Sequence, residues 1–186
     1  MGGGRRKNKL QLDLSKCMGF EIGKLFDIKN GMKYPSDMRE GGNLPLVSTS
    51  ALNNGVSDYI KYRDDSTYKN ILTVAYSGSV GATFYHKNEV FVGETVFALI
   101  PKYSSNIYNG MFISFILNYH NKRYSYGRKI IGSKYGKDVI KLPICYEDDG
   151  ETPVIDTTHK YSKEGYIPDF KFMEEYIKSL PYGDRL

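Results

Sequence analysis

Apolar and polar residues alternate along much of the first hundred residues, with the period of a β-strand. Residues 20–31, FEIGKLFDIKNG, alternate and end in Asn-Gly, which predicts a strand that runs into a turn. Residues 33–43 predict a loop, and residues 45–60 predict a short strand, a polar turn at Asn53-Asn54-Gly55 and more extended chain. The densest apolar runs, in residues 70–102, predict three to four short antiparallel strands.

The hydrophobic period changes to that of a helix in residues 109–122. This segment predicts an amphipathic helix with a core-facing stripe of Met111, Phe112, Phe115 and Ile116, and with Tyr119 on the same face. Asp169 is a plausible N-cap for a final helix over residues 170–180, which Pro181 helps to stop.

The chain between these helices alternates short elements with loops. Residues 133–138 predict one helical turn, and residues 139–144 predict a short strand ended by Pro143. Residues 145–167, here called the acidic loop, predict a loop or hairpin. The whole pattern is typical of an α+β fold: a β-rich single domain of twisted antiparallel strands with two principal helices, over residues 10–186.

Charge is distributed unevenly along the chain. The formal net charge is +5, but four basic residues lie in residues 1–9, MGGGRRKNK, which we expect to be a flexible basic tail or an expression scar. The rest has 22 basic against 21 acidic residues. Residues 121–141, here called the basic segment, carry +6, and residues 142–186 carry −5. A basic face balanced by an acidic one steers an anion to one side of the molecule.

The basic segment interleaves its cations with tyrosines and glycines. Cations that reach phosphates, rings that stack and glycines that let backbone approach closely are what a nucleic-acid surface needs. The alternative is the solvated loop and helix face of a lysine-rich protein.

No catalytic constellation is evident in the sequence. His86, His120 and His159 are widely spaced, and each is expected to be solvent-exposed or locally hydrogen-bonded. No GxSxG elbow, phosphate-binding loop or methyltransferase tetrad is present. The acids at 147–151 are too irregular for a calcium loop and predict a solvated turn. We expect no cofactor, no metal and no catalytic residue.

Cysteine content and hydropathy indicate an intracellular protein. Cys17 and Cys145 are far apart in the sequence and are expected to be reduced. No apolar run approaches the roughly 20 residues that span a bilayer. We therefore expect a cytoplasmic protein that does not contact membranes.

Five segments in order resemble the target recognition domain of type I restriction–modification specificity subunits and of related type IIB and IIG enzymes. The resemblance covers about residues 20–186, and the segments are FEIGKLFDIKNG, PLVSTSALNNGVSDYI, ILTVAYSGSVGATFYHKNEVFVGETVFALIPK, YSYGRKIIGSKYGKDVIKLPI and PDFKFMEEYIKSLPYGDRL. It implies a non-catalytic domain that reads one half of a bipartite double-stranded DNA target through the major groove. It also implies positioning of an N6-adenine methyltransferase subunit, and sometimes of a nuclease.

The sequence departs from the family plan. A full specificity subunit has two such domains separated by long helices, whereas this sequence predicts one domain and no spacer helix. The chain could be a half-subunit that forms a homodimer, a domain cut from a larger protein, or a free-standing relative. A protein-interaction module with little DNA affinity of its own, and a nuclease subunit, are the alternative functions.

Candidate DNA contacts follow from side-chain chemistry. Cations bind phosphates, Arg also pairs with guanine, and Asn pairs with adenine, although Asn53 and Asn54 could equally cap a turn. The candidate DNA-binding residues are Ser48, Thr49, Ser50, Asn53, Asn54, Tyr76, Ser77, Ser79, Arg123, Tyr124, Tyr126, Arg128, Lys129, Ser133, Lys134, Tyr135 and Lys137.

Overall fold

A four-stranded antiparallel sheet forms the centre of the molecule. The structure is a computed structural model that describes residues 10–35 and 41–185; the predicted tail over residues 1–9 lies outside the described residues. The strand order is β2-β9-β6-β7, with the strands β2 (Phe26–Asn30), β6 (Ile71–Ala75), β7 (Thr83–His86) and β9 (Val96–Pro101).

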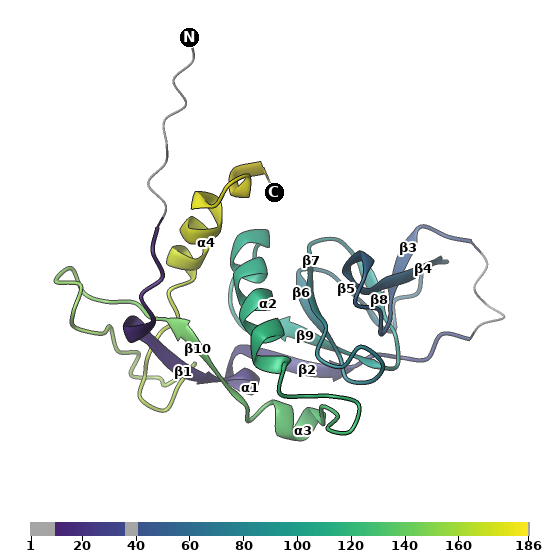
Figure 1. The fold of residues 1–186 in the computed structure, drawn as a ribbon, viewed down its shortest axis with the longest axis horizontal. Helices are drawn as coiled ribbons and strands as arrows, with labels where there is room; N and C mark the ends of the chain where they lie inside the picture. The colour runs from purple at the N-terminus through teal and green to yellow at the C-terminus, as the bar shows by residue number, and fades with distance from the viewer. Residues whose placement is uncertain (1–9, 36–40, 186) are drawn as a thin grey trace, which may run out of the picture.

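A second, smaller sheet packs beside the first (Figure 1). Its order is β4-β3-β8-β5, with the strands β3 (Leu44–Val47), β4 (Val56–Ile60), β5 (Thr67–Tyr68) and β8 (Val90–Val92). The predicted polar turn at Asn53–Gly55 is the short 3-10 helix η3 between β3 and β4. Within residues 70–102, β6, β7 and β9 are the antiparallel strands expected, whereas β8 belongs to the second sheet and pairs antiparallel with β5 and parallel with β3.

A separate two-stranded antiparallel sheet pairs the first described strand with the last. It pairs β1 (Cys17–Glu21), which follows the 3-10 helix η1 (Leu14–Lys16), with β10 (Val139–Pro143), the predicted strand ended by Pro143. The single strand expected over residues 20–31 is interrupted by the helical turn α1 (Ile22–Leu25). The turn forms because the backbone of Gly23 bonds to Gly136 and a Cβ at Gly23 would lie 2.9 Å from the Gly136 oxygen.

The helix α2 (Ile107–Asn121) covers one face of the central sheet. It begins two residues earlier than expected because Asn106 caps it: the Asn106 side chain accepts from the backbone of Asn109, whose side chain accepts from the Asn106 backbone. Gly110 lets the helix approach the sheet, since a Cβ there would lie 2.3 Å from the Tyr85 ring.

The core-facing stripe expected on α2 is half right: Phe112 is buried and Ile116 packs against the core, whereas Met111, Phe115 and Tyr119 are exposed. Phe112, Ile113 and Leu117 are the buried residues, and they pack with Leu72, Val74, Phe97 and Leu99 of the central sheet. Phe115 is 72% exposed and Met111 is 37% exposed. Because α2 is apolar on both faces, its helical period does not decide which face packs.

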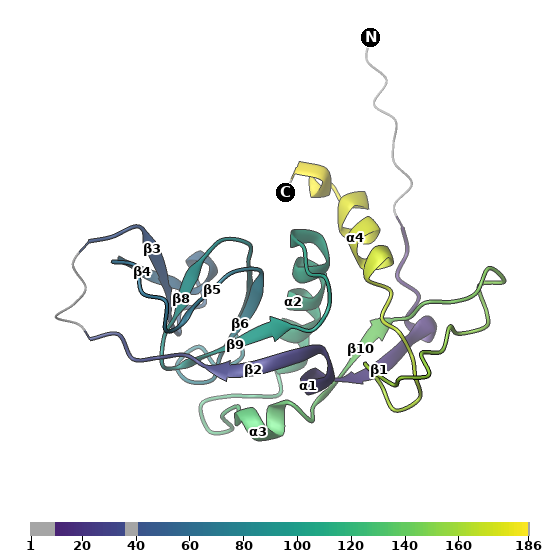
Figure 2. The same ribbon diagram turned by 180° about the vertical axis from the view of Figure 1, so that it is seen from behind.

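The remaining helices precede and follow β10 in the sequence. The helical turn α3 (Gly132–Tyr135) precedes β10, as expected, and α4 (Phe170–Ser179) follows the acidic loop and packs against α2. Asp169 caps α4 by accepting from the Phe172 backbone, which confirms the predicted N-cap. A last 3-10 helix, η4, spans Gly183–Arg185. The acidic loop projects at the end of the molecule opposite the second sheet (Figure 2).

Candidate nucleic-acid interface

Three segments that the sequence singled out for DNA contact touch one another in the fold. The turn between β6 and β7 lies against the loop after β3, because the Ser79 backbone donates to the Thr49 carbonyl at 3.2 Å. A Cβ at Gly78 would lie 2.7 Å from Thr49, so glycine permits this approach. The same turn meets the start of the basic segment, where the Asn121 amide donates to the Gly81 carbonyl at 3.3 Å.

The first part of the basic segment is a tight turn with Tyr126 and Gly127 at its tip. The backbone groups of Ser125 and Arg128 bond to each other in both directions, at 3.0 and 3.1 Å. Tyr126 is 78% exposed. The Arg128 guanidinium lies 5.8 Å from the Tyr124 ring centre, and the Lys129 ammonium lies 5.3 Å from the Tyr126 ring centre. The interleaved tyrosines therefore support the cations beside them.

The candidate cations of the basic segment are exposed and carry no counter-ion from the described part of the chain. They are Arg123, Arg128, Lys129, Lys134 and Lys137. The one acid of the segment, Asp138, is hydrogen-bonded to His120 instead. The cations are thus available for phosphates.

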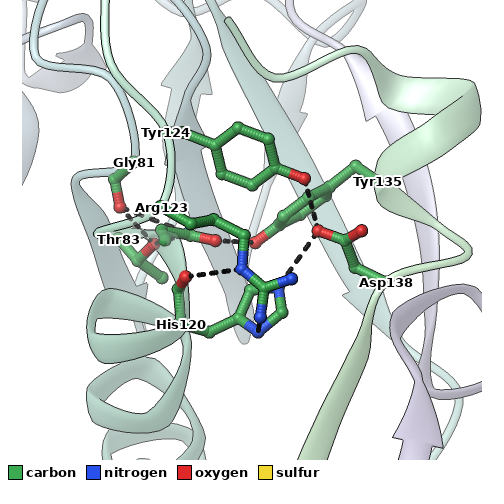
Figure 3. Close-up of polar contacts among 8 residues, drawn as sticks. Gly81, Thr83, His120, Arg123, Tyr124, Tyr135 and Asp138 are labelled. Atoms are coloured by element: carbon green, nitrogen blue, oxygen red, sulfur yellow. Dashed lines mark hydrogen bonds and ion pairs between the residues drawn. The ribbon is translucent and has the colours of Figure 1, made fainter. Parts of the chain in front are cut away.

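A polar network holds together the two ends of residues 122–137, here called the cationic loop (Figure 3). The Asp138 carboxylate accepts from His120 Nε2 at 3.0 Å and from the Tyr124 hydroxyl. The Tyr135 hydroxyl donates to Asn121 Oδ1 at 3.0 Å, and the Asn121 amide also donates to Thr83 Oγ1 at 3.1 Å. The network therefore joins α2, the basic segment and β7.

The hydrogen bonds of the network assign which of its atoms donate and which accept. Arg123 Nη2 can only donate, so His120 Nδ1, 3.0 Å away, accepts and carries no proton. His120 Nε2 then carries the proton that it donates to Asp138. Burial and the hydrogen bond to Asp138 raise the pKa of Tyr124 to about 12, which keeps its hydroxyl a donor at neutral pH.

Some candidate residues are engaged elsewhere. Tyr135 is fully buried, and burial raises the pKa of its hydroxyl, so the structure removes Tyr135 from the candidate DNA surface. The half-buried Tyr76 packs on Phe97 with ring centres 4.4 Å apart and donates to the Glu94 carbonyl. Ser50 bonds within its own turn to Leu52. Ser48, Thr49, Ser77 and Ser79 are partly exposed, and Ser133 is exposed.

Asn53 and Asn54 form the turn that was one of the two alternatives raised for them. Each adopts a positive φ, 50° and 53°, as turn-forming asparagines do. Both side chains are exposed, and neither forms a hydrogen bond with a described residue. The turn therefore shapes the loop and leaves two amides facing solvent.

Sequence reasoning missed His120, Asn121 and Asp138 as organisers of this site. His120 was expected to be exposed or locally bonded; it has the local bond, to Arg123, but its side chain is 6% exposed and its second partner, Asp138, lies 18 residues away. The expectation for His86 is also wrong, because His86 is buried and bonds to Thr73 Oγ1 at 2.9 Å. The one available signal was Asp138, a lone acid among seven cations.

Within residues 10–35 and 41–185, no three His, Cys, Asp or Glu side chains come together to hold a metal ion. No helix in the same ranges is long and apolar enough to cross a membrane.

The fold and the surface define a class: a β-rich domain that presents cations and short polar side chains on adjoining loops. Within that class, residues 15–149 match the family described as the type I restriction modification DNA specificity domain, and the chain belongs to this family. This membership confirms the resemblance and the assignment to a specificity component. The described sheets and helices confirm the α+β fold class.

Individual relatives agree with the family. The chain is 25% identical over 162 residues to the specificity subunit S.BcgI of a type II restriction enzyme from Heyndrickxia coagulans, with 87% of this chain and 42% of that protein covered. It therefore spans less than half the length of this relative.

Solved structures share the fold. The type I specificity subunit of M. genitalium matches with a TM-score of 0.56 and 19% identity, over 69% of this chain and 35% of that one. The HsdS subunit of Thermoanaerobacter tengcongensis matches with a TM-score of 0.54 and 18% identity, over 74% of this chain and 35% of that one.

Proposed function

We propose that this chain is a target recognition domain that reads one half of a bipartite duplex DNA target. The observation that carries the proposal is the contact of three candidate segments, one of which bears exposed cations that form no ion pair with any described residue. Arg123, Arg128 and Lys129 would bind phosphates and fix the register of the domain on the duplex.

Base readout would come from the same region. An arginine of the basic segment can pair with guanine O6 and N7, and an asparagine amide can pair with adenine N6 and N7. Asn53 and Asn54 present such amides on the loop that touches the β6–β7 turn. The short side chains of Ser48, Thr49, Ser77 and Ser79 would then let the backbone of these loops approach the DNA.

Family membership supports a proposal about the protein partners of this chain. The relative from Heyndrickxia coagulans is the specificity subunit of a restriction enzyme. A further solved structure concerns complex assembly of the type I restriction–modification system. It matches with a TM-score of 0.56 and 19% identity, over 73% of this chain and 36% of that one. We propose that this chain positions a separate N6-adenine methyltransferase subunit, with or without a restriction subunit, in the cytoplasm. In a homodimer, the second copy of the chain would read the other half of the target.

Titration of the chain against labelled duplexes tests the proposal. A duplex enriched from a random pool should bind more tightly than a scrambled one, and affinity should fall steeply between two salt concentrations as counterions are released. Absence of binding, or binding that ignores salt, overturns the proposal.

The same preparation separates the alternative functions. Binding that appears only after a methyltransferase subunit is added would identify a protein-interaction module. Cleavage of plasmid in the presence of magnesium would identify a nuclease instead. We expect neither result.

A further inference from the structure

Asp138 is the one acidic residue among the seven cations of the basic segment. If the segment bound phosphate through charge alone, Asp138 would weaken binding, and its removal would strengthen it. The position of its side chain indicates the opposite.

The Asp138 carboxylate closes the cationic loop. One oxygen, Oδ2, accepts from His120 Nε2 at the end of α2 and from the Tyr124 hydroxyl in the loop itself. These bonds span 18 and 14 residues, so Asp138 ties the end of the loop to its beginning (Figure 3). The Asp138 side chain is only 20% exposed, which strengthens its hydrogen bonds relative to those in water.

The two residues that Asp138 holds are the supports of two arginines. Arg123 bonds to His120 through the Nδ1 atom and the backbone carbonyl, at 3.0 and 3.2 Å. Arg128 lies over the ring of Tyr124. The positions of both guanidinium groups therefore depend on residues that Asp138 fixes.

The same network connects the loop to the rest of the site. The Tyr124 ring meets the buried Tyr135 ring edge-on, with centres 6.2 Å apart. Tyr135 bonds to Asn121, and Asn121 bonds to Gly81 of the β6–β7 turn. Disturbance at Asp138 would thus reach the turn that carries Ser77 and Ser79.

We propose that Asp138 is a positioning residue, which holds Arg123 and Arg128 in place for DNA although its own charge opposes DNA. The proposal rests on the DNA-binding function proposed above. A loop that is already ordered loses less conformational entropy on binding. This gain outweighs the unfavourable charge of one partly buried carboxylate.

Four variants separate position from charge. Asp138→Ala and Asp138→Asn change the net charge equally, but only asparagine keeps an oxygen that can accept from His120 and Tyr124. Tyr124→Phe removes one of the two bonds without changing the net charge. Asp148→Ala is the matched control, because Asp148 is exposed and forms no hydrogen bond with a described residue.

The affinity of each variant for the enriched duplex gives the first readout. We expect Asp138→Ala to weaken binding about fivefold or more, Asp138→Asn to weaken it less, and Tyr124→Phe to weaken it about threefold. Asp148→Ala should bind like the wild type. Tighter binding by both Asp138 variants to the same degree overturns the proposal.

The salt dependence of binding gives a readout that general destabilisation does not move. The slope of log affinity against log salt concentration reports the number of neutralised phosphates. The slope should become shallower in Asp138→Ala, because misplaced arginines contact fewer phosphates. A steeper slope would show that charge alone governs the segment and would overturn the proposal.

Hydrogen exchange of residues 122–137 distinguishes failure of this proposal from failure of the proposed function. If the wild-type chain binds no duplex, the DNA function is overturned, and positioning is still decided by exchange. We expect faster exchange in Asp138→Ala and Tyr124→Phe than in the wild type, with the protection of β6 and β9 unchanged. If Asp138→Ala fails to fold, Tyr124→Phe decides. Unchanged exchange in the loop overturns the positioning role.

Discussion

The basic segment and the acidic loop have opposite charge, and they are held in opposite ways. In the acidic loop, Asp149 accepts from the backbone of Glu151 and Thr152, and Asp156 accepts from the backbone of Thr158 and Lys160. Each of these bonds spans two to four residues. The acids of this loop shape their own turns, as aspartates in loops commonly do.

In the basic segment, the residues that hold the loop are different from the cations offered to a ligand. His120, Tyr124 and Asp138 hold the loop through bonds that span 14 and 18 residues. The cations Lys129, Lys134 and Lys137 take no part in any ion pair with a described residue. These lysines are therefore not needed to hold the loop in shape and can bind a ligand.

The largest expected effect concerns the charges themselves. Reversing Arg128 and Lys129 to glutamate should weaken DNA binding at least about thirtyfold, roughly 2 kcal/mol, because two phosphate contacts become repulsive. Reversing Lys160 and Lys163, two exposed cations of the acidic loop, is the matched control and should change affinity much less. Equal losses in a fluorescence anisotropy titration would mean that net charge alone controls binding, and the comparison would fail.

Much of the secondary structure could be predicted because its signals are local. Asp169 caps α4, Pro143 ends β10, and Asn53-Asn54-Gly55 turns the chain between β3 and β4. Each signal acts within a few residues of the element that it bounds. The basic segment was also evident, because charge is read directly from the sequence.

Contacts between distant segments could not be predicted in the same way. Both faces of α2 are apolar, and burial of Phe112 rather than Phe115 depends on how Gly110 sits on Tyr85 and how α4 packs. The parallel pairing of β8 with β3 joins strands that lie more than forty residues apart in sequence. The bond between His120 and Asp138 likewise follows from the path of the loop and leaves no spacing motif.

A second test asks whether the core or the acidic loop makes the fold sensitive to acid. Burial lowers the pKa of His86 to about 4 in the folded chain. The unfolded chain therefore binds more protons between pH 6.5 and 4, and the free energy of unfolding should fall as the pH falls through this range. The loss should be about 2 kcal/mol at pH 5.

Urea denaturation of the wild type and of His86→Gln at pH 7 and pH 5 measures this loss. The variant should lack most of it, because glutamine does not titrate and can still bond to Thr73. If the variant keeps the full acid sensitivity, groups outside the central sheet are responsible, and the acidic loop becomes the leading candidate.

A smaller effect is expected from the buried end of the network. Tyr135→Phe leaves Asn121 Oδ1 without its donor and should lower the free energy of unfolding by about 1–2 kcal/mol. Tyr161→Phe is the control in the acidic loop, where the hydroxyl forms no hydrogen bond with a described residue. Thermal or urea denaturation should separate the two variants. Similar stability in both would show that long-range bonds do not distinguish the basic segment.

The smallest expected effect is the protonation of an acidic-loop turn. Hydrogen bonds from the Thr152 side chain and from the backbone of Thr152 and Glu151 lower the pKa of Asp149 to about 2. The ionised Asp149 carboxylate therefore stabilises the turn fully when the pH is above 3.8, its ordinary pKa. This stabilisation is lost as the pH falls toward 2. The amide resonance of Thr152 should report this titration by NMR, and Asp149→Asn should abolish it. Because these bonds stay within the turn, the resonances of the basic segment should not follow the same midpoint; if they did, the two loops would be coupled and the acidic loop would not be locally held.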